Sequence, residues 1–360
     1  MGVEVVVEGL GKSFGTQAIW RDVTLTLPAG EVSVLLGPSG TGKSVFLKCL
    51  IGLLRPERGR VLINGVDLCS CAERDTYEIR KLFGVLFQDG ALFGSMSVYD
   101  NIAFPLREHT RKSEKEVNRI VMSKVDMVGM LGAERKLPGE ISGGMRKRAG
   151  LARALVLDPS IILCDEPDSG LDPVRTALLS QLLIDLNAQL DATILIVTHN
   201  ITVARTVPDN LGMLFRRELV LFGPRELLLT SDVPVVAQFL NGRKKGPIGM
   251  SEERDTADDP TPPPDTPDDA RGIVPQLDPT PGLPHRDAVR RRKLRLMQSL
   301  HTLPTPARQA VLTTMTPTDL DDYANWRRRT SAIPIATPGT TTPTTRVEEP
   351  VRRSRWGSSR

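Results

Sequence analysis

The sequence predicts an α/β fold, followed by a C-terminal extension of a different character. Three apolar runs, at residues 32–36, 161–166 and 193–197, have the composition of strands buried within a sheet, and segments of helical density lie between them. The prolines are distributed unevenly, because 17 of the 28 fall after residue 240. The chain therefore divides into a folded body and a proline-rich last third.

Charge divides along the same line. The first 240 residues carry 27 Lys and Arg against 28 Asp and Glu, and the last 120 carry 20 against 15, for a net charge of +4. A balanced body argues against a grip on the phosphate backbone of nucleic acid. No apolar run reaches about 18 residues and the first residues lack a basic segment, so we expect neither a membrane-spanning helix nor a secretory signal. The four cysteines lack CxxC spacing, which is typical of reduced thiols rather than of a zinc site.

The first apolar run leads into the most informative segment. A strand at Val32 to Leu36 is followed by GPSGTGKS, residues 37–44, and then by the apolar density of a buried helix at Val45 to Leu54. This is the G-x-x-x-x-G-K-[ST] pattern in the strand–loop–helix context that phosphate binding requires, because its glycines let successive backbone N–H groups point at phosphate oxygens. Lys43 is placed to reach the β- and γ-phosphates of a nucleotide, and Ser44 to offer its hydroxyl to Mg²⁺.

Two further strands end in polar residues suited to phosphate chemistry. The run IILCDE closes with Asp165, placed to hold Mg²⁺ through water, and Glu166, placed to orient and deprotonate an attacking water. The strand at residues 193–197 leads into His199, within reach of a γ-phosphate. Taken alone, a strand-end acidic pair or histidine is also typical of an ordinary solvated surface.

A second helix start suited to anions lies in ISGGMRKRAGLARAL, residues 141–155. Ser142, Gly143 and Gly144 form a flexible backbone segment at the head of a basic helix. The chain thus carries two phosphate-binding helix starts but one loop lysine. Two copies that face each other would use both starts on one nucleotide, so the pattern predicts a homodimer.

In order and spacing these motifs resemble those of the ATP-binding-cassette (ABC) ATPases over residues 3–240. The resemblance adds a Q-loop glutamine, a D-loop at Ser169 to Asp172, and Phe14 at the place where the family stacks an aromatic ring on adenine, although Phe14 could equally be a core residue. It implies ATP and Mg²⁺ as cofactors. The implied site residues are Glu166, His199 and Gln88 for catalysis; Ser44, Gln88 and Asp165 for the metal; and Phe14, Gly37, Pro38, Ser39, Gly40, Thr41, Gly42, Lys43, Ser44, Ser142, Gly143, Gly144 and Asp172 for the nucleotide.

Finer stretches narrow the resemblance. The segments ISGGM, FQDGALF at residues 87–93 and NIAFPLREHT at residues 101–110 resemble the ATPases that energise Mce-linked lipid transporters, the MlaF and MceG (Mkl) group. The element QFLNGRKKGPIGM at residues 238–250 and the long extension favour the actinobacterial MceG form, because MlaF-type proteins end shortly after QFL-x-G. Met145 replaces the usual signature glutamine, and we expect it to be tolerated because the signature's phosphate contacts come mainly from Ser142 and backbone amides.

This resemblance implies an ATP-hydrolysing subunit that works as a homodimer, peripheral to the cytoplasmic face of the inner membrane. Its permease would be YrbE-like and would dock near Gln88 to Pro105, with Mce substrate-binding proteins as indirect partners and no nucleic acid. The cargo would be a lipid of the sterol, fatty-acid or mycolic-acid class. Two alternatives stay open: the ATPase subunit of a polar-solute importer, and a soluble cassette ATPase of translation or DNA repair. One loop-lysine motif and no zinc-spaced cysteines disfavour the soluble class.

The resemblance also implies a RecA-like P-loop core with an antiparallel β subdomain and a helical signature subdomain. The expected divisions are an ATPase domain at 1–240 with its helical subdomain at about 89–156, a proline-rich acidic linker at 241–284, a helical segment at 285–316 and a disordered tail at 317–360.

The helical segment of the extension has apolar positions at helical spacing beside a basic face. This pattern predicts a helical hairpin that clamps the partner subunit or the permease, or that rests on anionic lipid, with a basic disordered segment as the alternative. The apolar positions are Val289, Leu296, Leu300 and Leu303, and the basic face comprises Arg290 to Lys293 and Arg295.

Overall fold

The computed structural model describes residues 2–249 and 273–324, apart from residues 318 and 322. Contacts divide the chain into two units, residues 1–314 and residues 315–360. In the described part of the second unit, the hydroxyl of Thr316 donates to Asp319 Oδ2 at 2.7 Å.

A six-stranded sheet forms the core, in the order β10–β9–β3–β8–β7–β6, and all of its strands except β10 run parallel. Every residue of β3, β7 and β8 is buried, as expected for apolar strands covered on both faces. The strands are β3 (Val32–Leu36), β6 (Phe83–Leu86), β7 (Ile161–Asp165), β8 (Thr193–Thr198), β9 (Asn210–Phe215) and β10 (Glu218–Pro224).

The register of this sheet aligns the ends of its central strands. Leu36 is paired with Thr198, and Asp165 with Val197. The residues that follow β3, β7 and β8 therefore emerge at one edge of the sheet, which is where α/β folds bind their ligands.

An antiparallel sheet packs beside this core through the helix that follows β3. Its order is β2–β1–β4–β5, and its buried side chains form one apolar cluster with α1 and with the inner face of β3, β7 and β8. Trp20 of β2 meets Phe46 of α1 edge to face, with ring centroids 6.0 Å apart. The elements are β1 (Val5–Phe14), β2 (Gln17–Leu27), β4 (Arg58–Ile63), β5 (Val66–Asp67) and α1 (Lys43–Leu50).

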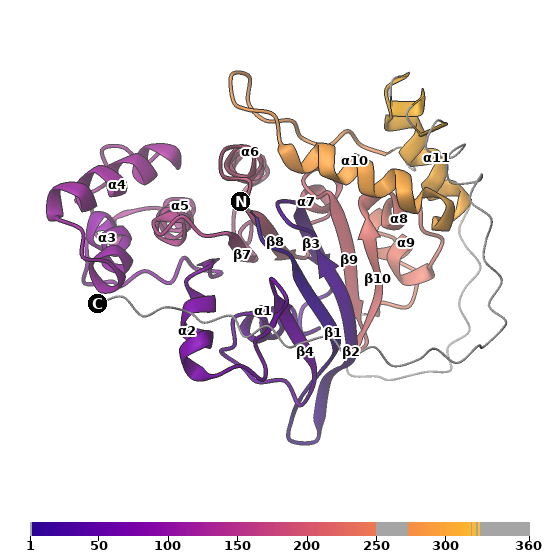
Figure 1. Ribbon diagram of the computed structural model, residues 1–360, viewed down its shortest axis with the longest axis horizontal. Helices are drawn as coiled ribbons and strands as arrows, with labels where there is room; N and C mark the ends of the chain where they lie inside the picture. Colours follow the sequence, from indigo (N-terminus) through magenta and orange to yellow (C-terminus); the bar gives the residue numbers. More distant parts are fainter. Residues whose placement is uncertain (1, 250–272, 318, 322, 325–360) are drawn as a thin grey trace, which may run out of the picture. The chain divides into compact units, whose positions relative to one another are not determined.

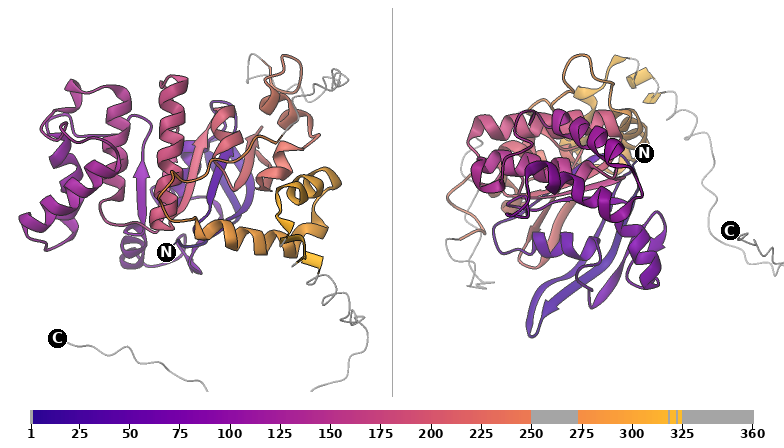
Figure 2. Two further views of the ribbon diagram at one scale, coloured as in Figure 1. Left: turned by 90° about the horizontal axis from the view of Figure 1, so that it is seen from above. Right: turned by 90° about the vertical axis from the view of Figure 1, so that its left-hand side faces the viewer.

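Helices α3, α4 and α5 gather on one side, away from β1 and β2 (Figures 1 and 2). The helix α4 begins at a capping box, in which Ser113 and Glu116 each bond the other's backbone N–H. Helix α8 packs on β9 and β10, and α6 contacts α7. The bounds are α2 (Glu73–Arg80), α3 (Val98–His109), α4 (Glu114–Met127), η1 (Pro138–Glu140), α5 (Gly143–Leu155), α6 (Pro173–Leu190), α7 (Ile201–Thr206), α8 (Arg225–Leu229) and α9 (Pro234–Asn241).

The extension continues the first unit. It contains α10 (Asp287–Ser299), the short η2 (Leu300–Thr302) and α11 (Thr305–Thr314), and α11 packs on α8. Contacts keep the chain in one compact unit as far as Thr314, so the boundary expected at about residue 240 does not coincide with that of the unit. The last part of the expected linker has no helix or strand and contacts the body, where the Leu277 N–H donates to the Thr206 carbonyl at 2.8 Å. Residues 250–272 and 325–360, which hold the middle of the linker and most of the predicted tail, lie outside the described residues.

None of the helices among the described residues combines the length and the apolarity of a membrane span.

Candidate functional site

The loop at residues 37–44 connects β3 to α1, and its glycines are required by its shape. Gly40 and Gly42 have φ angles of 83° and 86°, in the left-handed region that favours glycine. A Cβ on Gly42 would lie 2.6 Å from Trp20 Nε1 and 2.3 Å from the Cγ2 of Ile19, because β2 lies directly against the loop. The hydroxyl of Thr41 donates to the Pro38 carbonyl at 3.0 Å. The loop is therefore a tightly curled backbone that ends at the amino end of α1.

Lys43 is almost fully buried at the start of α1. Its ammonium donates to the carbonyls of Gly37 and Pro38 at 2.8 and 2.7 Å, and lies 3.9 Å from Glu166 Oε1. The lysine thus bridges the loop and the acidic end of β7, so its positive charge lies where a phosphate bound in the loop would meet the carboxylates.

Ser44 and Asp165 meet at the same point. The hydroxyl of Ser44 donates to Asp165 Oδ1 at 2.8 Å. Burial raises the pKa of Asp165, and the hydrogen bond from Ser44 partly offsets this. These oxygen donors fit Mg²⁺, which is usually held by one or two carboxylates and completed by substrate phosphates. The described residues contain no group of three or more His, Cys, Asp or Glu placed to hold a metal ion.

Glu166 and His199 come together at the ends of β7 and β8. The Nδ1 atom of His199 lies 3.3 Å from Glu166 Oε1. Glu166 has a φ of 45°, which is uncommon for a residue with a side chain and is typical of strained positions at functional sites. Asp168 accepts a hydrogen bond from the Thr198 hydroxyl at 2.8 Å, and this holds the segment after β7 against the end of β8.

A lysine that the sequence analysis did not single out supports this group from α5. The ammonium of Lys147 donates to the Glu166 carbonyl at 3.2 Å, to Ser169 Oγ at 3.0 Å, and to the Ser169 carbonyl. Burial lowers the pKa of Lys147, and nearby carboxylates partly offset this. The sequence held a signal for it, since Lys147 shares a helix face with the buried Leu151 and Leu155.

Four predicted site residues lie apart from this group. Ser142 is exposed at the start of α5, where its hydroxyl accepts from the Met145 N–H at 3.3 Å, and Gly143 beside it is also exposed. Gln88 is exposed just after β6. Asp172 caps α6. Within the described part of the chain, no hydrogen bond or ion pair joins any of these four residues to Ser44, Asp165, Glu166 or His199.

Phe14 ends β1 at the tip of a hairpin. Its side chain is 49% exposed, and the ammonium of Lys12 lies 5.1 Å from its ring centroid. Phe14 is therefore not a core residue, and its ring has an open face of the kind that stacks on a planar ligand.

Comparisons with known proteins agree with this geometry. The family model described as "ABC transporter" matches residues 20–169. The "Probable ribonucleotide transport ATP-binding protein mkl" of Mycobacterium tuberculosis is 68% identical over 320 residues, which cover 87% of this chain and 89% of that protein. The "Intermembrane phospholipid transport system ATP-binding protein MlaF" of Haemophilus influenzae is 39% identical, over 68% of this chain and 92% of that protein.

A solved structure extends the comparison to the fold. The dimeric post-hydrolysis state of the ATP-binding cassette MJ0796, bound to ADP and Pi, matches with a TM-score of 0.57 at 28% identity, over 61% of this chain and 98% of that chain. The chain is thus similar to cassettes that bind and hydrolyse ATP, and the predicted α/β fold with a P-loop core is confirmed.

Proposed function

The chain belongs to the ABC transporter family of ATP-binding proteins, and from this premise we propose that it energises an Mce-type importer of lipids as a homodimer. It is an ATPase and a subunit of a transporter. The observation that carries the lipid proposal is its 39% identity, over 68% of its length, to MlaF, whose name describes phospholipid transport.

The residues of the site suit phosphoryl transfer to water. The loop and Lys43 bind the phosphates, while Ser44 and Asp165 are placed to hold Mg²⁺, which would neutralise phosphate charge when bound. Glu166 orients and deprotonates the attacking water, and His199 holds the Glu166 carboxylate from 3.3 Å away. Phe14 stacks on the adenine.

The exposed signature supports a site shared between two copies. Ser142 and Gly143 present the amino end of α5 to solvent, and the Ser142 hydroxyl accepts from the Met145 N–H of its own helix. In the proposed dimer, this helix start, which includes Gly144, binds the phosphates held by the partner's loop. Asp172 and Gln88 complete the site. Because ATP touches both copies only when they are closed, its binding energy drives closure.

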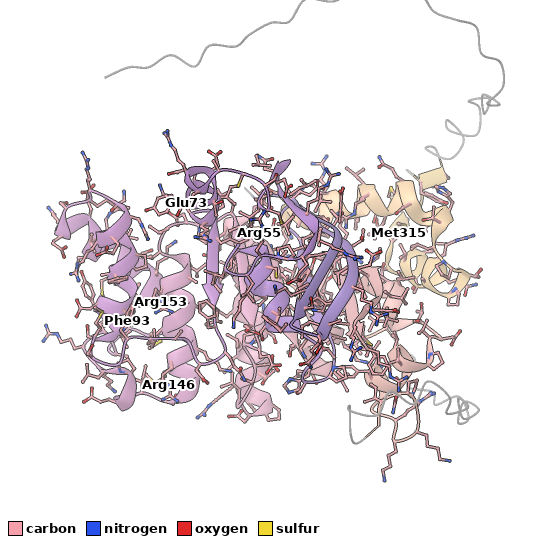
Figure 3. The ribbon with its side chains drawn as sticks, turned by 90° about the horizontal axis from the view of Figure 1, so that it is seen from below. Arg55, Glu73, Phe93, Arg146, Arg153 and Met315 are labelled. Carbon is pink, nitrogen blue, oxygen red and sulfur yellow. The ribbon has the colours of Figure 1, made fainter. Side chains whose placement is uncertain are left out.

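An aromatic groove supports the docking of a permease. It has a volume of about 480 Å³, and its lining includes Phe93 and Arg153, which lie near each other in Figure 3. The guanidinium of Arg153 donates to the carbonyls of Gly90 and Ala91, both at 2.8 Å, and so fixes the segment that follows Gln88. The groove is lined by Tyr77, Phe83, Phe87, Phe93, Phe104 and Pro105, with Arg80, Lys81 and Arg153 at its basic edge.

This lining suits a short amphipathic helix of a permease that presents an aromatic or aliphatic anchor and an acidic residue. We place the chain on the cytoplasmic face of the inner membrane, under a YrbE-like permease that works with Mce substrate-binding proteins.

A second candidate is an importer of a polar solute. It is favoured by the name of the M. tuberculosis relative, which describes ribonucleotide transport. The names of both relatives describe transport subunits, so they give no support to a role in translation or DNA repair.

Turnover is tested by Glu166→Gln in the full chain. We expect retained ATP binding, a stable closed dimer and loss of phosphate release, because the general base is lost while the phosphate ligands stay. The matched control is Glu218→Gln, at an exposed position of β10. Sustained phosphate release by Glu166→Gln would show that Glu166 is not the base.

Cargo is tested in a deletion strain supplied with labelled cholesterol, fatty acid or ribonucleotide. We expect lipid uptake to fall and to be restored by the wild-type chain but not by Glu166→Gln, with ribonucleotide uptake unchanged. Loss of ribonucleotide uptake with intact lipid uptake would refute the lipid proposal in favour of the second candidate.

A further inference from the structure

Three carboxylates of the body are buried at the edge of the core sheet that lies opposite the nucleotide loop. We call Glu31, Asp209 and Glu226 the acidic socket, and their exposed fractions are 0%, 0% and 2%. Glu31 precedes the amino end of β3, Asp209 precedes that of β9, and Glu226 lies in the first turn of α8. Three negative charges cannot remain buried so close together unless cations and hydrogen bonds compensate them.

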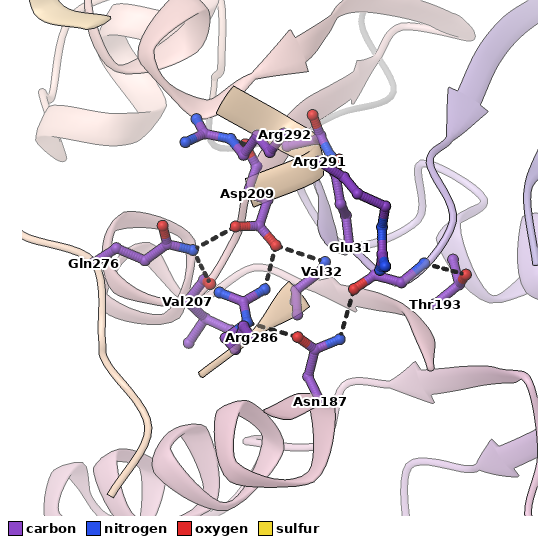
Figure 4. Close-up of polar contacts among 12 residues, drawn as sticks. Glu31, Val32, Asn187, Thr193, Val207, Asp209, Gln276, Arg286, Arg291 and Arg292 are labelled. Atoms are coloured by element: carbon purple, nitrogen blue, oxygen red, sulfur yellow. Dashed lines mark hydrogen bonds and ion pairs between the residues drawn. The ribbon is translucent and has the colours of Figure 1, made fainter. Parts of the chain in front are cut away.

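The compensating cations come from the extension. Arg292 donates to Glu226 Oε2 at 2.6 Å, Arg295 donates to Glu31 Oε2 at 2.6 Å, and Arg286 pairs with Asp209. Figure 4 shows Arg286 reaching between Asp209 and Asn187, as well as the approach of Arg291 and Arg292 to the same region. Arg291, Arg292 and Arg295 of the basic face, which the sequence assigned to a partner subunit, a permease or lipid, therefore meet the chain's own body.

Asp209 shows how closely the two parts fit. Its Oδ2 accepts from the Val32 N–H at 2.8 Å, and its Oδ1 accepts from the Gln276 amide at 2.9 Å. Burial acts to raise the pKa of Asp209, but the charges of Arg286 and Arg292 outweigh it and hold the pKa below its usual range. The carboxylate thus stays ionised, with its bonds divided between β3 and the extension.

The extension also holds the far ends of two helices that begin at the nucleotide site. Its Leu277 N–H bonds the Thr206 carbonyl at the end of α7, and Thr280 donates from its N–H and hydroxyl to Asp185 of α6 at 2.8 and 2.7 Å. The helix α6 begins after the D-loop, and α7 begins just after His199. The extension therefore contacts two helices that begin at the site, at residues remote in sequence from their first turns.

We propose that the acidic socket is a recognition site for an arginine-rich helix, and that this chain supplies the helix as α10 of its own extension. Residues 1–249 are then not a self-sufficient ATPase without residues 273–311. Apolar contacts complete the fit, since Ala288, Leu296 and Leu300 are buried along α10 and η2, and Ala307 and Val311 along α11. The extension thus completes the folded unit of the ATPase, although it comes from the far end of the chain.

The first test is a double-mutant cycle in the full-length chain, with Arg292→Met, Glu226→Gln and the pair together. Each single change leaves one buried charge without its partner and should lower the Tm by about 5–10 °C. The double change removes both charges and should restore part of that loss. Arg290→Met, at an exposed position of the same helix, is the control and should leave the Tm unchanged. Single variants with the wild-type Tm, or a double variant that loses the sum of the two, would overturn the proposal.

The second test does not depend on a destabilised variant. A protease recognition sequence is placed between residues 250 and 272 of the otherwise native chain, and the folded protein is cleaved there. We expect the two fragments to co-elute at physiological salt with full ATPase activity. Arg286→Glu with Arg292→Glu in the same chain should release the C-terminal fragment, with loss of activity. Separation of the native fragments with undiminished activity would refute the proposal, whatever the cargo of the transporter.

Discussion

Lys147 offers the sharpest test of how the signature helix supports the catalytic carboxylate. Lys147→Met keeps the length of the aliphatic chain and removes only the ammonium. The change leaves three acceptors, the Glu166 carbonyl and two oxygens of Ser169, without their donor. At about 1 kcal/mol for each buried acceptor, and with some return from an ammonium that is no longer desolvated, we expect a loss of about 2–3 kcal/mol. For a chain of this size that is a fall in Tm of about 5 °C.

The same substitution should slow turnover more than it weakens ATP binding. The hydrogen bonds described for the Lys147 ammonium go to the Glu166 carbonyl and to two oxygens of Ser169, and not to the nucleotide loop. A displacement of Glu166 by about 1 Å would lower kcat roughly 10- to 100-fold, with little change in the KM for ATP. The assays are thermal unfolding and phosphate release, with Lys115→Met, at an exposed position of α4, as the control. A Lys147→Met variant with the wild-type Tm, or with a raised KM at unchanged kcat, would refute this reasoning.

Three further changes have distinct expected outcomes. Asp165→Asn should abolish phosphate release yet raise the Tm of the nucleotide-free protein, because the raised pKa of this buried carboxyl means that its ionisation costs stability. The gain in Tm should be largest at neutral pH and should vanish once the pH falls below the ordinary carboxyl pKa. Thermal unfolding measured across pH tests this. Gly42→Ala places a Cβ 2.6 Å from Trp20 Nε1 at a φ of 86°, so the Tm should fall by several degrees and equilibrium dialysis should show loss of ATP binding. Arg153→Met releases the Gly90 carbonyl beside the aromatic groove, so reconstituted vesicles should lose permease-stimulated ATPase activity while the basal rate is retained.

Local patterns predicted the core strand and the loop well, and they failed at helix ends. The predicted strand at Val32 to Leu36 coincides with β3. The helix predicted as far as Leu54 ends instead at Leu50, because Gly52 adopts a φ of 69°. Apolar residues continue past that turn, and Leu54 still packs on the core cluster although it is outside the helix. Hydrophobic density reports burial, whereas the backbone geometry of one glycine decides where the helix stops.

The place of the extension could not be predicted by the same means. The periodicity of residues 286–315 correctly indicated helices with a basic face, but it carries no information on what that face meets. The partner of Arg295 is Glu31, which lies 264 positions away. One signal was available, since a carboxylate next to a largely apolar strand, such as Glu31 before Val32, needs a cation from elsewhere in the fold.

Trp20 provides an optical consequence of the packing between β2 and the nucleotide loop. Its indole is 1% exposed and lies against the Cα of Gly42, so any rearrangement of the loop changes the surroundings of a fluorophore already present in the protein. The chain has three tryptophans, and the other two, Trp326 and Trp356, lie outside the described residues. In variants that keep only Trp20, ATP binding would change the tryptophan fluorescence. The measurement needs no added label and no substitution of a residue that binds phosphate.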